Sequence, residues 1–171
     1  MFAKTGLVAA AFFLTACSGD DGDNNGNPGG SGNAGSFIEG EVDGVQFNNL
    51  EIQGQSLAVA TTSGTGAGRL IMVTGSDTNT NAMSVIMLGI TQTGEYTINS
   101  EDDGTVLAYI PVDSPSYDTS NCAGATGTLN ITHIDETKVE GTFNFVGKVD
   151  ENCGQSKTIT SGSFRGVFLT N

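Results

Sequence analysis

The strongest constraint on the fold is a two-residue alternation of apolar and polar side chains, which is clearest in residues 138–146. In an extended chain Val139, Phe143 and Phe145 fall on one face, and the polar residues between them fall on the other. This period is typical of a β-strand with one buried face. No segment carries a 3.6-residue period long enough to predict a helix.

Turn-forming residues, mainly glycine and asparagine, divide the rest of the chain into short segments of the same kind. Strands are expected at 37–42, 45–47, 57–61, 69–74, 83–90, 95–98, 105–110, 127–134, 138–146 and 157–169. Asp43-Gly44 is expected to form a tight hairpin turn. The pattern predicts an all-β fold, an antiparallel β-sandwich of about nine or ten short strands, with a closed β-barrel as the alternative.

Residues 70–73 and 85–88 depart from the alternation, because they are apolar at every position. Two such strands that pair would form the centre of a sheet covered on both faces. We expect the Ser/Thr-rich connections to fold over the outer face. The alternative is an exposed apolar patch that serves a partner or self-association.

The first 16 residues have the layout of a signal peptide, with Lys4 followed by an apolar run over residues 6–14. That run is far shorter than the roughly 20 residues of a membrane-spanning helix. Leu14-Thr15-Ala16-Cys17 then resembles the lipobox of bacterial lipoproteins, which implies cleavage before Cys17 and acylation of Cys17. Several acyl chains make such an anchor stable. The alternative is an ordinary signal peptide with an incidental cysteine.

Residues 18–36 hold no large apolar side chain and read as a flexible tether for a single domain at 37–171. A tether of this length has a mean span of about 25 Å. Within it, Asp20, Asp21 and Asp23 resemble the export signal of Bacteroidota lipoproteins, which places them on the outer face of the outer membrane. A solvated linker, and a periplasmic location, are the alternatives. A calcium loop is disfavoured because its twelfth position is Gly32.

Once Cys17 is lipidated, Cys122 and Cys153 have only each other as partners. In an oxidising envelope compartment this pair predicts a disulfide. Two buried free thiols and a metal site are the alternatives. Metal is disfavoured because His133 is the only histidine and neither cysteine belongs to a C-x-x-C motif.

Net charge excludes several classes of partner. The chain carries a formal charge of −13 at pH 7. It would therefore repel nucleic acid and anionic membrane surfaces.

No catalytic constellation is visible, and we expect neither an enzyme nor a cofactor. His133 is the only histidine available as a base, and it lies beside Asp135 near a strand end, where a structural role is expected. The glycine-rich stretches 63–68 and 141–148 lack the spacing of phosphate-binding loops. Among the tyrosines, Tyr117 in Pro115-Ser116-Tyr117-Asp118 is the candidate for an exposed ligand-binding ring.

A set of short motifs occurs in order along residues 37–171. The set consists of Asp43-Gly44-Val45-x-Phe47, Gly94-Glu95-Tyr96-Thr97-Ile98, Gly127-Thr128-Leu129-x-Ile131-Thr132, Gly141-Thr142-Phe143-x-Phe145 and Ile159-Thr160-x-Gly162-x-Phe164. It resembles a domain-of-unknown-function family found in Bacteroidota lipoproteins. The resemblance implies an all-β lipoprotein that is secreted or held in the outer membrane, and it transfers no catalytic residue.

These observations lead us to expect an envelope lipoprotein anchored through acylated Cys17, facing the cell exterior and acting as a non-enzymatic binding or accessory module. Its partner would be a protein or a glycan. A structural subunit of an envelope complex is the first alternative. A glycan hydrolase that uses paired carboxylates is a more distant one.

Overall fold

A computed structural model describes residues 35–101, 104–120, 122–149 and 153–169. The proposed signal peptide, the lipidation site Cys17 and the acidic residues Asp20, Asp21 and Asp23 lie outside these residues. The strands are β1 (Phe37–Val42), β2 (Val45–Asn48), β3 (Glu51–Ile52), β4 (Gln55–Ser56), β5 (Val59–Ser63), β6 (Leu70–Ser76), β7 (Ala82–Leu88), β8 (Gly94–Asn99), β9 (Val106–Ile110), β10 (Tyr117–Asp118), β11 (Thr126–Ile134), β12 (Lys138–Val149) and β13 (Ser156–Val167), and a 3-10 turn, η1 (Gly66–Gly68), precedes β6.

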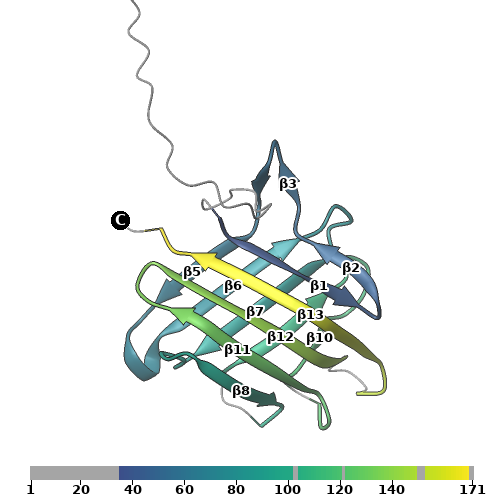
Figure 1. Cartoon of the computed structure of the whole chain (residues 1–171). Coiled ribbons are helices and arrows are strands. Elements are labelled where there is room, and N and C mark those ends of the chain that lie inside the picture. Colours follow the sequence, from purple (N-terminus) through teal and green to yellow (C-terminus); the bar gives the residue numbers. More distant parts are fainter. Residues whose placement is uncertain (1–34, 102–103, 121, 150–152, 170–171) are drawn as a thin grey trace, which may run out of the picture.

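Eleven of these strands form one curled antiparallel sheet (Figure 1). Its front layer is β2-β1-β13-β12-β11-β8, and its back layer is β10-β9-β7-β6-β5. The layers meet where β10 pairs with the end of β12, and β5 and β6 pack across β13 and β1. The all-β prediction is confirmed. The single curled sheet forms two packed layers, as in the expected sandwich. It is not the closed barrel of the alternative, because β2, β5 and β8 are edge strands within the described residues.

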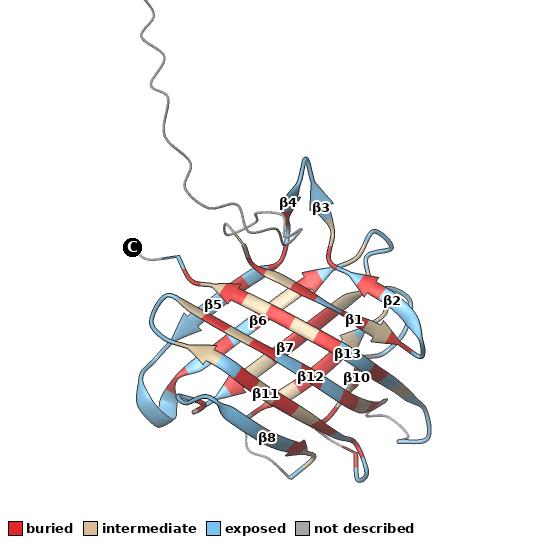
Figure 2. Cartoon of the chain, in the orientation of Figure 1, coloured by how far each residue is buried: buried red, intermediate tan, exposed pale blue. Residues whose placement is uncertain are grey.

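The core lies between the two layers. Alternate side chains of every long strand point into it, so that buried and more exposed residues alternate along β11, β12 and β13 (Figure 2). Val139, Phe143 and Phe145 are all buried on the inner face of β12, as the alternation predicts. Burial of a large apolar side chain stabilises the fold by roughly 1.5–3 kcal/mol.

The described residues include no helix with the length and apolar character of a membrane span.

Two tight turns have the backbone of a hairpin that requires positive φ at both central residues. Asp43 and Gly44 have φ of 50° and 81°, which confirms the expected turn between β1 and β2. Gln53 and Gly54 have φ of 53° and 74° and close a separate two-stranded hairpin, β3–β4. This hairpin, which we call the finger, projects beyond the sheet (Figure 1).

The chain enters the domain beside the finger. Ser36 is fully buried, and its hydroxyl oxygen accepts a hydrogen bond of 2.9 Å from the backbone N–H of Val167. The start of β1 is therefore fixed to the end of β13.

The two segments that are apolar at every position pair as β6 and β7. Ile71 and Val85 point inward and are fully buried. On the outer face, Leu70 lies opposite Leu88, and their exposed fractions are 41% and 40%. With Met72 they form an exposed apolar patch, which we call the back patch. The expectation that Ser/Thr-rich connections cover this face is wrong for the described residues.

The two layers approach closely at Gly166 on β13. A Cβ atom at this position would lie 2.6 Å from a methyl carbon of Val73 and 2.8 Å from Cβ of Ala60. Glycine is therefore required for β5 and β6 to pack against β13. Gly68, in contrast, has no atom within 4 Å of the position that its Cβ would take.

We expect Gly166→Ala to lower the free energy of unfolding by about 1–3 kcal/mol, because the added methyl group overpacks the core. Gly68→Ala is the matched control and should change it by less than about 0.5 kcal/mol. Urea denaturation followed by circular dichroism measures both. Equal stability of the two variants would show that the layers are not in contact at Gly166.

Candidate functional site

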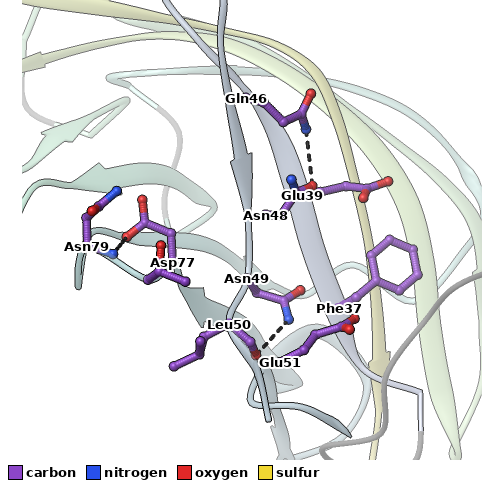
Figure 3. A pocket seen from close by; sticks show the side chains of 10 residues that line it. Phe37, Glu39, Gln46, Asn48, Asn49, Leu50, Glu51, Asp77 and Asn79 are labelled. Atoms are coloured by element: carbon purple, nitrogen blue, oxygen red, sulfur yellow. Dashed lines mark hydrogen bonds between the residues drawn. The ribbon is translucent and has the colours of Figure 1, made fainter. Parts of the chain in front are cut away.

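A hollow of about 620 Å³ lies at the end of the sandwich where the chain enters (Figure 3). We call it the end groove. One side is formed by the hairpin β1–β2, another by the base of the finger and a third by the turn between β6 and β7. The lining residues are Phe37, Glu39, Gln46, Asn48, Asn49, Leu50, Glu51, Asp77, Thr78 and Asn79.

Asn49 fixes the position of the finger at the groove. Its side chain is buried, the carbonyl oxygen accepts a hydrogen bond of 2.8 Å from the N–H of Ile38, and the amide nitrogen donates to the hydroxyl of Ser56 at 2.7 Å. A Cβ atom on Gly75 would lie 2.7 Å from Cβ of Asn49. The glycine in β6 thus leaves the room that the asparagine occupies.

The turn between β6 and β7 is built around Asp77. One carboxylate oxygen accepts hydrogen bonds from the N–H groups of Asn79 and Asn81 at 2.8 and 3.0 Å, and the other accepts from the Asn81 side chain at 2.9 Å. These bonds fix the turn, so the side chains of Thr78 and Asn79 are presented at the rim. Both are exposed.

The strands β1 and β2 supply a carboxylate and two amides. Glu39 accepts a hydrogen bond of 2.8 Å from the hydroxyl of Ser163. The Gln46 side chain donates to the backbone oxygen of Gly40 at 3.1 Å and to the side-chain oxygen of Asn48 at 3.2 Å. Hydrogen bonds therefore orient side chains that are exposed on the groove side, which limits the entropy lost when a ligand binds.

Phe37 adds the aromatic ring of the groove. Its ring is half-buried, and the Arg165 guanidinium lies 5.7 Å from the ring centre. Arg165 pairs with Glu140 at 2.7 Å. Burial raises the pKa of Glu140, but Lys138 and Arg165 outweigh that effect and hold it below the ordinary value. The charged cluster thus keeps Arg165 against the ring.

The charge of the end groove is negative. Glu39, Glu51 and Asp77 line it, and no lysine or arginine does. Among the described residues no group of three His, Cys, Asp or Glu side chains is placed to hold a metal ion. The arrangement fits a ligand that offers many hydroxyl groups and no negative charge, because carboxylates accept hydrogen bonds and side-chain amides both donate and accept them.

A second hollow, of about 480 Å³, lies beside β8. We call it the β8 groove. Its lining mixes the apolar side chains of Leu88, Ile90, Tyr96 and Ile98 with the polar ones of Glu95, Thr97 and Thr105.

Tyr117, the expected exposed tyrosine, is instead buried, with 8% of its surface exposed. It belongs to β10, where it pairs with Tyr109 on one side and Val149 on the other. Its hydroxyl donates a hydrogen bond of 3.3 Å to the side-chain oxygen of Gln155. The prediction of an exposed ring is therefore wrong, since the segment is a strand of the sheet and not a free loop.

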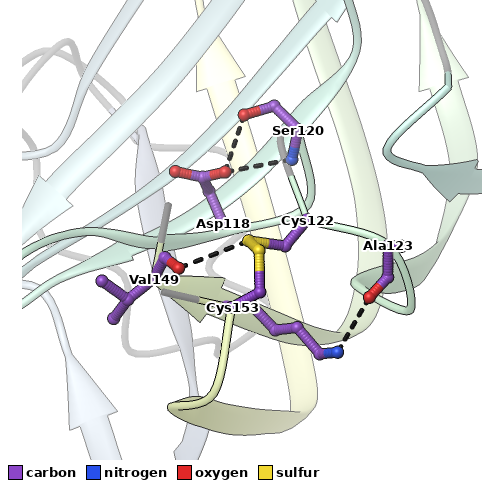
Figure 4. The surroundings of a disulfide bond; sticks show 7 residues. Asp118, Ser120, Cys122, Ala123, Val149 and Cys153 are labelled. Atoms are coloured by element: carbon purple, nitrogen blue, oxygen red, sulfur yellow. Dashed lines mark hydrogen bonds between the residues drawn. A yellow bond between two sulfur atoms is a disulfide. The ribbon is translucent and has the colours of Figure 1, made fainter. Parts of the chain in front are cut away.

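The disulfide between Cys122 and Cys153 is confirmed (Figure 4). It joins the connection β10–β11 to the connection β12–β13, and the Cys122 sulfur lies 3.3 Å from the backbone oxygen of Val149. Closing a loop of 31 residues stabilises the fold by about 3–4 kcal/mol in the chain-entropy model. The bond lies next to the seam at which β10 pairs with β12.

His133 lies at the end of β11 and contacts the turn that follows it. Its Nε2 atom is 2.7 Å from a carboxylate oxygen of Asp135. This contact, together with hydrogen bonds from Thr137 and Lys138, holds the pKa of Asp135 well below its usual range. His133 thus caps a turn, in agreement with the structural role expected from the sequence.

A salt bridge fixes the turn between β1 and β2. The Lys157 ammonium lies 2.7 Å from one carboxylate oxygen of Asp43, and the N–H of Thr158 donates to the other at 2.9 Å. Lys157, followed by Thr158, lowers the pKa of Asp43. The hydrogen bond with the Asp43 carboxylate in turn raises the pKa of Lys157.

The sequence analysis did not identify the end groove. Its residues come from segments between 37 and 79 and, apart from Phe37 and Leu50, each is an ordinary polar residue. The available signal was the density of Asn, Asp and Glu in residues 48–51 and 77–81.

Comparison with known proteins gives one match. The profile of a family described as "Domain of unknown function (DUF6252)" matches residues 38–168. No curated protein and no solved structure matches the chain.

We expect Asp43→Asn to lower the free energy of unfolding at pH 7 by less than about 1 kcal/mol, because the salt bridge is exposed. Asparagine tolerates the positive φ of this position, whereas alanine does not. Asp43→Ala should therefore lower the free energy of unfolding by about 1 kcal/mol more than Asp43→Asn does. The folded-state pKa of Asp43 is lowered, so its contribution is present at pH 7 and is lost as the pH falls through that lowered value.

Urea denaturation at pH 7 and at about pH 2 measures the effect of Asp43→Asn. The stability difference between the native chain and the variant should close at the acidic pH. A difference that stays constant would assign the effect to packing instead of charge.

Proposed function

The chain belongs to the family of the domain of unknown function DUF6252, and we propose that it is a lipid-anchored binding module of the bacterial envelope that holds a saccharide in the end groove. The observation that carries the proposal is the composition of this groove. It offers carboxylates, side-chain amides and one aromatic ring in a hollow of about 620 Å³. Binding sites of this volume typically hold a small ligand.

The groove favours a neutral or amino saccharide. Vicinal hydroxyl groups both donate and accept, and so match the carboxylate of Glu39 and the amides of Gln46 and Asn48. Phe37 offers an apolar edge for the C–H groups of a sugar ring. The three carboxylates disfavour anionic sugars, since like charges repel.

The anchor is proposed from the sequence alone. Leu14-Thr15-Ala16-Cys17 supports acylation of Cys17 after removal of residues 1–16. Asp20, Asp21 and Asp23 support export to the outer face of the outer membrane in a bacterium of the Bacteroidota type. Residues 17–36 would then act as the tether.

We propose binding without catalysis. A glycosidase needs a carboxyl group with a raised pKa opposite a second carboxylate. The pKa values of Asp43, Asp135 and Glu140 are all lowered, which is the opposite of what a general acid needs. No observation therefore favours the hydrolase alternative.

A second candidate function is that of an interaction subunit in an envelope complex. The back patch of Leu70, Met72 and Leu88 supports it, because these side chains are exposed by 41%, 37% and 40% on one face. Clustered exposed apolar side chains mark protein contacts more often than isolated ones do.

The end groove is tested with the full chain, purified in detergent, on an array of neutral, amino and anionic saccharides. We expect retention of neutral or amino saccharides and no retention of anionic ones. Gln46→Ala with Asn48→Ala should weaken binding by about tenfold or more, because each hydrogen bond contributes about 0.5–1.5 kcal/mol.

The matched control is Asn130→Ala, on the outer face of β11 and outside the groove. It should bind like the native chain. A preference for anionic saccharides, or equal binding by the double variant, would contradict the proposal.

The anchor is tested by protease treatment of intact cells. We expect the native chain to be cleaved, Cys17→Ala to leave the membrane fraction, and the variant with Asp20, Asp21 and Asp23 changed to Asn to be protected. Cleavage of the native chain only after lysis would show that it faces the periplasm.

A further inference from the structure

The strand β8 leaves one edge of the front layer open. It pairs with β11 from Gly94 to Asn99 without a register shift, and with no other strand of the described residues. In an antiparallel strand, alternate residues direct their N–H and C=O groups away from the existing partner. Such an edge is a template for another strand.

The edge lacks several features that usually protect such strands, although it carries one charged side chain, Glu95. No proline, lysine or bulge occurs in β8, which is six residues long. The edge strand β2 is shorter, with four residues, and its Gln46 side chain bonds to nearby backbone. β8 is thus the less protected of the two edges of the front layer.

The β8 groove lies on the open side of the strand. Its lining includes Leu88, Ile90 and Thr105 in addition to β8, and no residue of β11. Tyr96 and Ile98 point toward the core side, because they lie opposite Leu129 and Gly127. An added strand would therefore set alternate side chains against the exposed Leu88 and the half-buried Tyr96.

The negative charge around β8 favours one kind of docking segment over others. Glu95 is exposed in β8, Glu101 follows the strand, and no lysine or arginine lines the β8 groove. The whole chain carries −13 at pH 7, so a second copy would be repelled. A segment with basic side chains on its outward face would be attracted.

We propose that the open edge of β8 is the docking site for an extended, basic segment of a partner protein, which adds to the front layer as a further antiparallel or parallel strand. Main-chain hydrogen bonds provide the affinity in this mode of recognition, and the pockets for alternate side chains provide the specificity. The apolar side chains of the segment contact Leu88 and Tyr96 in the β8 groove, and its basic side chains lie beside Glu95. The proposal does not depend on the end groove.

The test uses the full chain in detergent and a capped heptapeptide of alternating lysine and valine. Hydrogen–deuterium exchange, read by mass spectrometry, reports on the amides of Gly94–Asn99. We expect saturating peptide to slow exchange of the open-edge amides by about tenfold or more, because each becomes hydrogen-bonded. A peptide of alternating glutamate and valine should give no protection.

Two comparisons separate strand addition from loose attraction. The lysine peptide with every backbone amide N-methylated keeps its charge and side chains but loses the donors on both edges, and it should not protect β8. Glu95→Lys should weaken binding of the unmodified peptide by about two- to fivefold. Asp113→Lys makes the same charge change at an exposed residue of the β9–β10 connection and should leave binding unchanged.

Three results would overturn the proposal. The first is unchanged exchange in Gly94–Asn99 at saturating peptide, and the second is equal protection by the N-methylated peptide. The third is protection of β8 without peptide, together with a dimer in sedimentation, which would show that a second copy occupies the edge.

Discussion

The strand β12 is hydrogen-bonded to three strands, and the arrangement of both layers depends on this. Most of its length pairs with β13 on one side and β11 on the other, while its last residues pair with β10. Within the described residues, the strand pairing that joins the back layer to the front consists of Tyr117 and Asp118 of β10. A contact of two residues is weak by itself, so the adjacent disulfide has a clear physical role. The disulfide restricts the conformations of the unfolded chain and so stabilises the folded state in which the seam is formed.

The two outer faces of the sheet differ in chemistry. The outer face of the front layer carries polar side chains such as Glu39, Ser163 and Thr142, whereas the back layer exposes Leu70, Met72 and Leu88. The same inner core supports both faces, because alternation leaves the outward residue of each strand free to vary. One domain can therefore present a hydrogen-bonding surface and an apolar surface without a second core.

Local patterns predicted much of the fold. The alternation in β12, the turn at Asp43-Gly44 and the pairing of Cys122 with Cys153 follow from neighbouring residues or from the number of cysteines, and all are confirmed. Long-range pairing was not accessible in this way. Tyr117 is buried because a short segment inserts between β9 and β12, and the end groove exists because Asn49 joins the finger to β1. The proposed lipid anchor and the membrane face to which it leads are inferred from residues before 35, and they do not follow from the fold of the domain.

The place where the chain enters the domain has a mechanical consequence. Ser36 is held by β13, and Phe37, the first residue of β1, lines the end groove. For a domain attached through residues 17–36, this entry point is the pivot about which the whole body turns. A ligand in the end groove then sits close to the pivot and moves little as the body rotates. The disulfide lies near the opposite end of β13, because Cys153 shortly precedes its first residue, Ser156, whereas Ser36 is held at its last residue, Val167. It therefore moves through a wider arc than the groove does. A ligand in the end groove would thus be displaced little by rotation of the domain, while the end that carries the disulfide would be displaced more.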